Sequence, residues 1–429
     1  MPRSSQLRTV FTLLLVIVAG ARQLAAYSVL SHEVVVDVVW TSQIEPLLRQ
    51  RFPAATAEDL RQAHAYAYGG SIIQDMGYYP FGSHEFSDLT HYVRSGDFIR
   101  NLLRSSQDLN EYAFALGAMA HYAADTEGHP AVNRAVADEI PELRDRYGPV
   151  VTYSENPKAH IRVEFGFDAA QVAKRRFPPN LYHDLIGFQI SKPLLERAFL
   201  QTYGLPLQEV IKHEDLAIGS YRRAVSKVIP TFTRAAVATH RADLVREIPD
   251  FNRRKFIYRL SRSEYHREFG RVYQRPSFGT RVLVFLFHLV PKVGPFKVVN
   301  FQTPTPQTED LYFRSMNRTI DRYRAELTAL RRGESPDLPN LDFDTGHATE
   351  AGEYDLSDAT YATLLHKLAG KHFQPLTPEL RDNLLTFYQD TNAPFSTKRH
   401  QQAWQRTLQE IQELKATAPA VQLSAAEGK

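Results

Sequence analysis

The chain has 429 residues and no cysteine. The absence of cysteine excludes disulfide bonds, and it excludes metal sites that use thiolate ligands. It does not argue against export from the cell, because a chain of this length can be stabilised by burial of apolar side chains alone. Any metal site in this protein must therefore use ligands other than thiolates, such as histidine and carboxylate side chains.

The chain also lacks a strong excess of charge of either sign, with 51 basic and 48 acidic residues. Residues 1–26 carry three arginines and no acid, so the rest of the chain holds 48 basic and 48 acidic residues. This balance argues neither for nor against a nucleic-acid partner.

The apolar run at the N-terminus, Val10 to Ala19, is too short to span a membrane. It follows a basic start and precedes small residues, a pattern typical of a secretory signal peptide. Cleavage after Ala21 or after Ala26 fits the small residues. We therefore expect residues 1–26 to be a signal peptide and the protein to be secreted or periplasmic.

Strand-like alternation is scarce, and apolar residues recur mostly at helical spacing. One apolar run rich in β-branched residues, Val282–Val290, is the exception. The sequence therefore predicts an all-α protein. Helices are expected around Val34–Val39, from Thr56 toward Asp75, and over Asp97–Ser105, Leu109–Thr126, His160–Gly166, Leu181–Tyr203, Asp358–Ala369, Thr377–Asp390 and Ser396–Ala416.

Two stretches read as loops. Residues 77–96 are rich in Gly, Tyr, Ser and Asp and carry His84, Asp88 and His91. Residues 332–356 are rich in Gly, Pro, Asp and Glu with few apolar anchors, which predicts a surface loop or linker.

The stretch Ala113–Pro130 begins as a small-residue helix and ends at Gly-His-Pro. His121 and Asp125 are four residues apart, so they project from one face of that helix. Gly128 and Pro130 predict that the helix ends there and that His129 lies on the following turn. Gly117 and Ala118 are small enough to let another element approach closely. A lone His-x-x-x-Asp pair is more often structural than metal-binding.

A second helix repeats the spacing with His160 and Glu164. Imidazole nitrogens and carboxylate oxygens are the ligands that zinc takes when no thiolate is available. A set of this size can hold more than one ion, and neighbouring metal ions suit phosphoryl chemistry.

The order of these residues behind a signal peptide resembles that of the zinc-dependent phospholipase C family, which is related to zinc-dependent single-strand nucleases. The resemblance covers Tyr27 to Tyr203 and rests on the ordered set His32, Asp75, His91, His121, Asp125, His129, His160 and Glu164. It implies a multi-helical catalytic domain with up to three zinc ions at the bottom of a cleft.

The resemblance also implies a role for each residue. Tyr27, as the mature N-terminal residue, would bind one ion through its amine and carbonyl, together with the His32 imidazole. Asp125 would bridge that ion to a second one. The remaining ligands of the second ion would be Asp75, His91 and His121, and those of the third ion would be His129, His160 and Glu164.

Two residues of this set, Asp75 and Asp125, are the expected catalytic residues. By the family analogy, Asp75 would orient or deprotonate the attacking water. His84 competes with His91 for the loop position. We favour His91, because an aromatic residue follows it and its distance from Asp75 fits better.

The resemblance therefore predicts a secreted zinc-dependent phosphodiester hydrolase. We favour a phospholipase C that releases diacylglycerol and a phosphorylated head group. A single-strand nuclease is the alternative enzyme, and nucleic acid is a partner only in that case. A non-catalytic metal-binding or surface-attachment protein on the same helical scaffold is the alternative outside enzymes.

The predicted domains are a signal peptide (1–26), a catalytic domain (27–235), a helical C-terminal region of unknown role (236–416) and a disordered tail (417–429). The apolar run Thr280–Lys292 would serve either as a buried core element or as a peripheral membrane contact. A basic zone over 241–275 would be either a solvated helical face or a surface for a polyanion. The sequence does not indicate an oligomeric state.

Overall fold

The structure is a computed structural model that describes residues 29–174, 187–225, 229, 233 and 302–419. Within these ranges the protein contains helices and no strand, so the predicted all-α class is confirmed. No described helix is long and apolar enough to cross a membrane. The elements are α2 (Val29–Val39), η1 (Trp40–Ile44), α3 (Glu45–Arg51), α4 (Ala57–Gly70), η2 (Ile73–Tyr78), α5 (His84–Tyr92), α6 (Ser95–Ser105), α7 (Leu109–Glu139), α8 (Pro141–Tyr147), α9 (Pro157–Ala173), α11 (Lys192–Tyr203), α12 (Leu207–Val210), α13 (Glu214–Arg223), α18 (Pro306–Arg331), α19 (Asp355–Ala369), α20 (Pro378–Phe387), η5 (Ser396–Arg399) and α21 (Gln401–Ala416).

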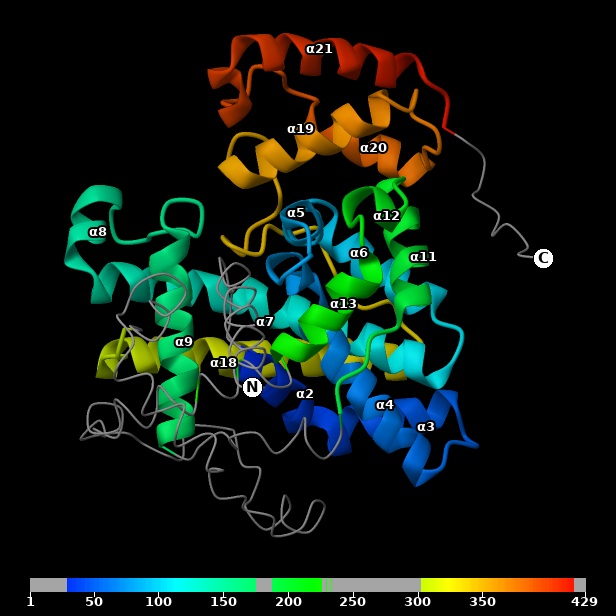
Figure 1. The fold of residues 1–429 in the computed structure, drawn as a ribbon, viewed down its shortest axis with the longest axis vertical. Helices are drawn as coiled ribbons and strands as arrows, with labels where there is room; N and C mark the ends of the chain where they lie inside the picture. Colours follow the sequence, from blue (N-terminus) through cyan, green and yellow to red (C-terminus); the bar gives the residue numbers. More distant parts are fainter. Residues whose placement is uncertain (1–28, 175–186, 226–228, 230–232, 234–301, 420–429) are drawn as a thin grey trace, which may run out of the picture.

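Helix α7 runs through the middle of the molecule, and α4 and α18 pack against it (Figure 1). Its backbone meets that of α4 where both helices carry glycine. A Cβ on Gly117 would lie 2.0 Å from the Ala67 carbonyl oxygen, and a Cβ on Gly70 would lie 2.0 Å from that of Phe114. Only glycine permits this approach. The prediction that small residues at 117 and 118 admit another element is therefore confirmed.

Helix α7 begins after Asp108, whose side chain accepts a hydrogen bond from the Glu111 N–H, as a helix N-cap does. The predicted end at Gly128 and Pro130 is wrong, because the helix continues to Glu139. Proline removes only one backbone hydrogen bond, and the buried packing on both sides of this helix outweighs that loss. His129 therefore lies on the helix rather than on a turn.

The prediction of a loop over residues 77–96 is wrong for most of its length, because helices form there. Helix α5 covers His84 to Tyr92, and its buried Phe86 and Leu89 anchor it at helical spacing. The polar and aromatic residues around this short helix hide its period in the sequence. The helix expected from Thr56 is confirmed at its start, since Thr56 and Asp59 exchange capping hydrogen bonds at the beginning of α4.

The prediction of a surface loop or linker over 332–356 is wrong in its location. The stretch is largely irregular, but it is partly buried against the first half of the chain, and Leu338, Leu341 and Phe343 are core residues. These apolar residues alternate with polar ones, so their role as anchors was hard to recognise. Beyond this segment, α19, α20 and α21 form a layer at one end of the molecule (Figure 1).

Several predictions fall on residues that the structure does not describe. They are the signal peptide with Tyr27, the residues 181–186 of the expected helix Leu181–Tyr203, the basic zone 241–275, the apolar run 280–292 and most of the tail 417–429. The described part of Leu181–Tyr203 forms helix α11 only from Lys192. The boundary at residue 235 also stays a prediction.

Candidate metal centre

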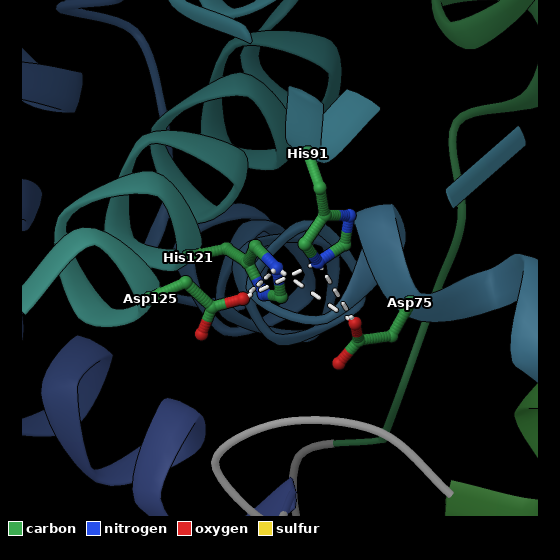
Figure 2. A group of neighbouring side chains, drawn as sticks. All are labelled: Asp75, His91, His121 and Asp125. Carbon is green, nitrogen blue, oxygen red and sulfur yellow. Dashed lines mark ion pairs between the residues drawn. The ribbon is translucent and has the colours of Figure 1, made fainter. Parts of the chain in front are cut away.

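Four buried side chains form the first group of potential ligands: Asp75, His91, His121 and Asp125. They come from η2, α5 and α7, and Figure 2 shows the two imidazoles turned toward the two carboxylates. The His91 Nε2 lies 3.3 Å from Asp75 Oδ1 and 3.4 Å from Asp125 Oδ2. The His121 Nε2 lies 2.9 Å from Asp125 Oδ2 and 4.0 Å from Asp75 Oδ1. Three elements separated in sequence therefore converge on one small volume.

Asp125 faces histidines with both of its oxygens. Its Oδ1 lies 3.3 Å from the Nε2 of His32, which α2 contributes. Its Oδ2 faces His91 and His121, and it also lies 3.4 Å from the Nε2 of His129. A carboxylate in this position has the geometry that a bridge between two ions requires.

A second group lies beside the first. His129, His160 and Asp344 each offer one ligand atom, and these atoms lie within 4.8 Å of one another. His160 comes from α9, where its Nε2 lies 2.7 Å from Oε1 of Glu164, one turn further along. The imidazole rings of His129 and His160 lie 4.9 Å apart. Asp344 comes from the irregular segment between α18 and α19.

Many ligand atoms of the two groups are buried and make no hydrogen bond within the described part of the chain. They are the Nε2 atoms of His91, His121, His129 and His160, Oδ1 of Asp75, and both carboxylate oxygens of Asp125. Both carboxylate oxygens of Glu164, which lies beside the second group, also make no hydrogen bond there. Buried polar atoms are nearly always paired, and an ion is one of the few explanations for such a cluster. The donor set of imidazole nitrogens and carboxylate oxygens also fits zinc.

The electrostatics of the first group agree with a cation site. Burial lowers the pKa of His32 to about 4, and the neighbouring His121 adds to this. Burial also disfavours the charged form of His91, but Asp125 and Asp75 raise its pKa to about 9. Asp125 is buried as well, yet the facing histidines hold its pKa well below the usual range. The carboxylates that favour a proton on His91 favour any cation in its place.

Every predicted ligand within the described residues lies in or beside these two groups. His91 is buried at the first group, whereas His84 is exposed at the start of α5 and lies outside both groups. Tyr27 is outside the described residues, so its role as a ligand stays a prediction.

Sequence reasoning missed Asp344. Burial disfavours its charged form, but hydrogen bonding by His129 and the neighbouring imidazoles give it a pKa below the usual range. The available signal was the alternation of Leu341 and Phe343 with Asp342 and Asp344 inside a segment that otherwise reads as a linker.

Residues 34–212 match the family model described as zinc dependent phospholipase C. No curated protein and no solved structure matches the chain at a significant level. The matched segment contains the whole first group together with His129, His160 and Glu164. His32 lies just before its start, and Asp344 lies far beyond its end.

Proposed function

Residues 34–212 belong to the zinc-dependent phospholipase C family, and from this premise we propose that the chain hydrolyses phosphodiesters with bound zinc and that its substrate is a phospholipid. The observation that carries the proposal is the set of buried imidazole nitrogens and carboxylate oxygens that converge without hydrogen bonds. Such an arrangement is costly to fold unless cations compensate it.

The ligands divide among three ions under this proposal. His32 and Asp125, with Tyr27, would hold one ion, and His129, His160 and Glu164 would hold another. Asp75, His91, His121 and the second oxygen of Asp125 would hold a further ion. When bound, zinc ions lower the pKa of coordinated water and stabilise negative charge on phosphate oxygens.

The protein's own residues bind and orient the reacting groups. Asp75 lies at the edge of the first group with Oδ1 free of hydrogen bonds in the described chain, where it can accept a proton from the attacking water. The buried Tyr153 hydroxyl also has no hydrogen-bond partner within the described part of the chain. The Tyr153 ring lies 5.5 Å from the His160 ring. Burial and nearby carboxylates raise the Tyr153 pKa, so the hydroxyl stays protonated and can donate to a phosphate oxygen.

Two exposed apolar side chains favour a lipid as the substrate. Phe81 is 56% exposed on the loop that joins the Asp75 and His91 elements, and Leu216 on α13 is 55% exposed. Helix α13 is joined to that loop because the Ser220 hydroxyl donates a hydrogen bond to the Pro80 carbonyl oxygen. Exposed apolar side chains on and next to the loop between these two ligand-bearing elements are suited to the surface of a lipid aggregate.

The test compares phosphatidylcholine in mixed micelles with single-stranded DNA, using the protein without residues 1–26. We expect release of diacylglycerol and phosphocholine that a chelator abolishes and added zinc restores. DNA cleavage without lipid hydrolysis would exclude the phospholipid substrate. Three bound zinc ions without turnover of either substrate would favour the non-catalytic alternative.

A matched pair of variants separates the site from general effects on the fold. His91→Ala removes a buried ligand and is expected to abolish turnover. His84→Ala, at the exposed start of the same helix, is expected to leave turnover unchanged. Loss of turnover in His84→Ala alone would transfer the ligand role to His84.

A further inference from the structure

Three of the converging imidazoles are oriented in the same way. Each directs Nε2 into the site and uses Nδ1 for a hydrogen bond outside it. The Nδ1 of His91 lies 2.7 Å from the Ser87 carbonyl oxygen, and that of His121 lies 3.0 Å from the Ser71 carbonyl oxygen. The Nδ1 of His129 lies 3.2 Å from Asp344 Oδ1. Only the third acceptor is a side chain, and only this one comes from outside the matched segment.

The surroundings of Asp344 give its carboxylate a full set of donors from the protein. Oδ1 accepts from His129 and from the Asn133 side-chain amide at 3.3 Å. Oδ2 accepts from the Tyr153 N–H at 2.9 Å and from the Tyr354 hydroxyl. An oxygen that already accepts two hydrogen bonds has little capacity left to bind a metal ion.

Close packing on α7 fixes the position of the loop that carries Asp344. Pro130 has no N–H, so the Thr126 carbonyl, four residues earlier, lacks its usual helical partner. Gly346 packs at this place with φ of +74°, and a Cβ there would lie 2.6 Å from the Thr126 oxygen. Next to Asp344, the Phe343 N–H donates to the His91 carbonyl oxygen at 3.3 Å. The loop is therefore attached to α7 and α5 beside both groups.

We propose that Asp344 is a positioning residue for the metal centre, acting through His129, so that a loop outside the matched segment completes the third zinc site. This proposal rests on the zinc-binding function proposed above. A carboxylate that accepts from Nδ1–H fixes the imidazole tautomer and leaves the Nε2 lone pair for the metal. His129 alone among these three histidines depends on a charged residue that a single substitution can remove.

The test measures zinc affinity by competition with a chromophoric chelator in the full mature chain and in Asp344→Asn. The asparagine keeps the shape but places an amide donor either at His129 or at the Tyr153 N–H. We expect the affinity for one ion to fall about 10–100-fold while the others are unchanged. An unchanged affinity for all ions would overturn the proposal.

Nuclear magnetic resonance of the protein labelled with ¹⁵N-histidine supplies a second readout that needs no turnover. We expect a proton on His129 Nδ1 in the parent, hydrogen-bonded with and without zinc, and a displaced signal in Asp344→Asn. A metal-bound Nδ1 would overturn the positioning role. A parent that binds no zinc would contradict the proposed function itself, whereas normal zinc binding with an unaffected variant would contradict only the role of Asp344.

Asp342→Asn is the matched control, two residues earlier in the same loop. Its side-chain oxygen can still accept from the N–H groups of Asp344 and Thr345, and within the described residues no hydrogen bond joins it to His129. We expect unchanged zinc affinity. If Asp344→Asn does not fold, Tyr354→Phe removes one donor to the same carboxylate, and we expect a several-fold loss for one ion. An unchanged affinity in that variant would also overturn the proposal.

Discussion

The two groups of ligands differ in what orients their histidines. In the first group, His91 and His121 are held by backbone carbonyls of nearby helices, all within the matched segment. In the second group, His129 is held by a carboxylate 215 residues away. Backbone carbonyls are fixed by the helices themselves, whereas a remote side chain depends on the packing of its loop. The first group is therefore a local product of the fold, and the second requires both halves of the chain.

Asp125 is the residue that joins the two groups, so its substitution should have the largest effect. In Asp125→Asn the bridging charge is lost from a carboxylate that faces four imidazoles. We expect lipid turnover to fall at least about a thousandfold, about 4 kcal/mol in transition-state stabilisation. Elemental analysis should show fewer zinc ions per chain.

Glu127→Gln is the control, on the same helix. It loses a partly exposed ion pair with Arg318 at 2.7 Å and a longer one with Arg322 at 3.9 Å, each worth about 0–1 kcal/mol. Normal zinc content and turnover in Asp125→Asn would show that the Asp125 carboxylate does not bridge two ions and does not connect the two groups of ligands.

Glu164→Gln tests whether the second group can fail alone. Glu164 forms an ion pair with His160, and within the described residues no ion pair joins it to the first group. We expect loss of one zinc ion, retention of the others and roughly a hundredfold lower turnover. Lys158→Ala, at an exposed position in the first turn of α9, should behave like the parent. Loss of all zinc in Glu164→Gln would show that the groups are not independent.

The difference between the two groups also explains how much of the site could be predicted from the sequence. The pairs His121/Asp125 and His160/Glu164 are readable because a helix places residues four apart on one face. His129 was correctly selected as a candidate, but its helix was predicted to end too early because the packing that sustains α7 through Pro130 is not visible locally. Asp344 could not be predicted, since its contact with His129 depends on long-range packing of an irregular segment.

Gly346→Ala perturbs the attachment of that segment without changing any polar group. The left-handed conformation costs an alanine about 1–2 kcal/mol, and the clash with the Thr126 carbonyl should add about 1–3 kcal/mol. We expect a lower melting temperature and weaker binding of one zinc ion.

Gly333→Ala separates the two costs, because Gly333 has φ of +76° and no atom within 4 Å of the added Cβ. Gly333→Ala should lose only the about 1–2 kcal/mol of stability that the left-handed conformation costs, and its zinc affinity should match that of the parent. Equal destabilisation in the two variants would mean that the loop at Gly346 moves to make room for the added Cβ without further loss of stability.

Glu139, at the end of α7, joins the two halves through a 2.6 Å hydrogen bond that its Oε1 accepts from the Thr308 hydroxyl on α18. Burial raises the pKa of Glu139 from 4.5 to about 7. The folded protein therefore holds this proton more tightly than the unfolded chain does, and the free energy of unfolding should decrease as pH rises from 4.5 through 7, by about 2 kcal/mol.

Glu139→Gln keeps the acceptor and removes the titration, so urea unfolding across this range should show a smaller decrease in the free energy of unfolding. Asp138→Asn, which removes the adjacent exposed charge, should keep most of the parent's pH dependence. If the parent and Glu139→Gln lose stability equally, the contact between α7 and α18 does not depend on the protonation of Glu139.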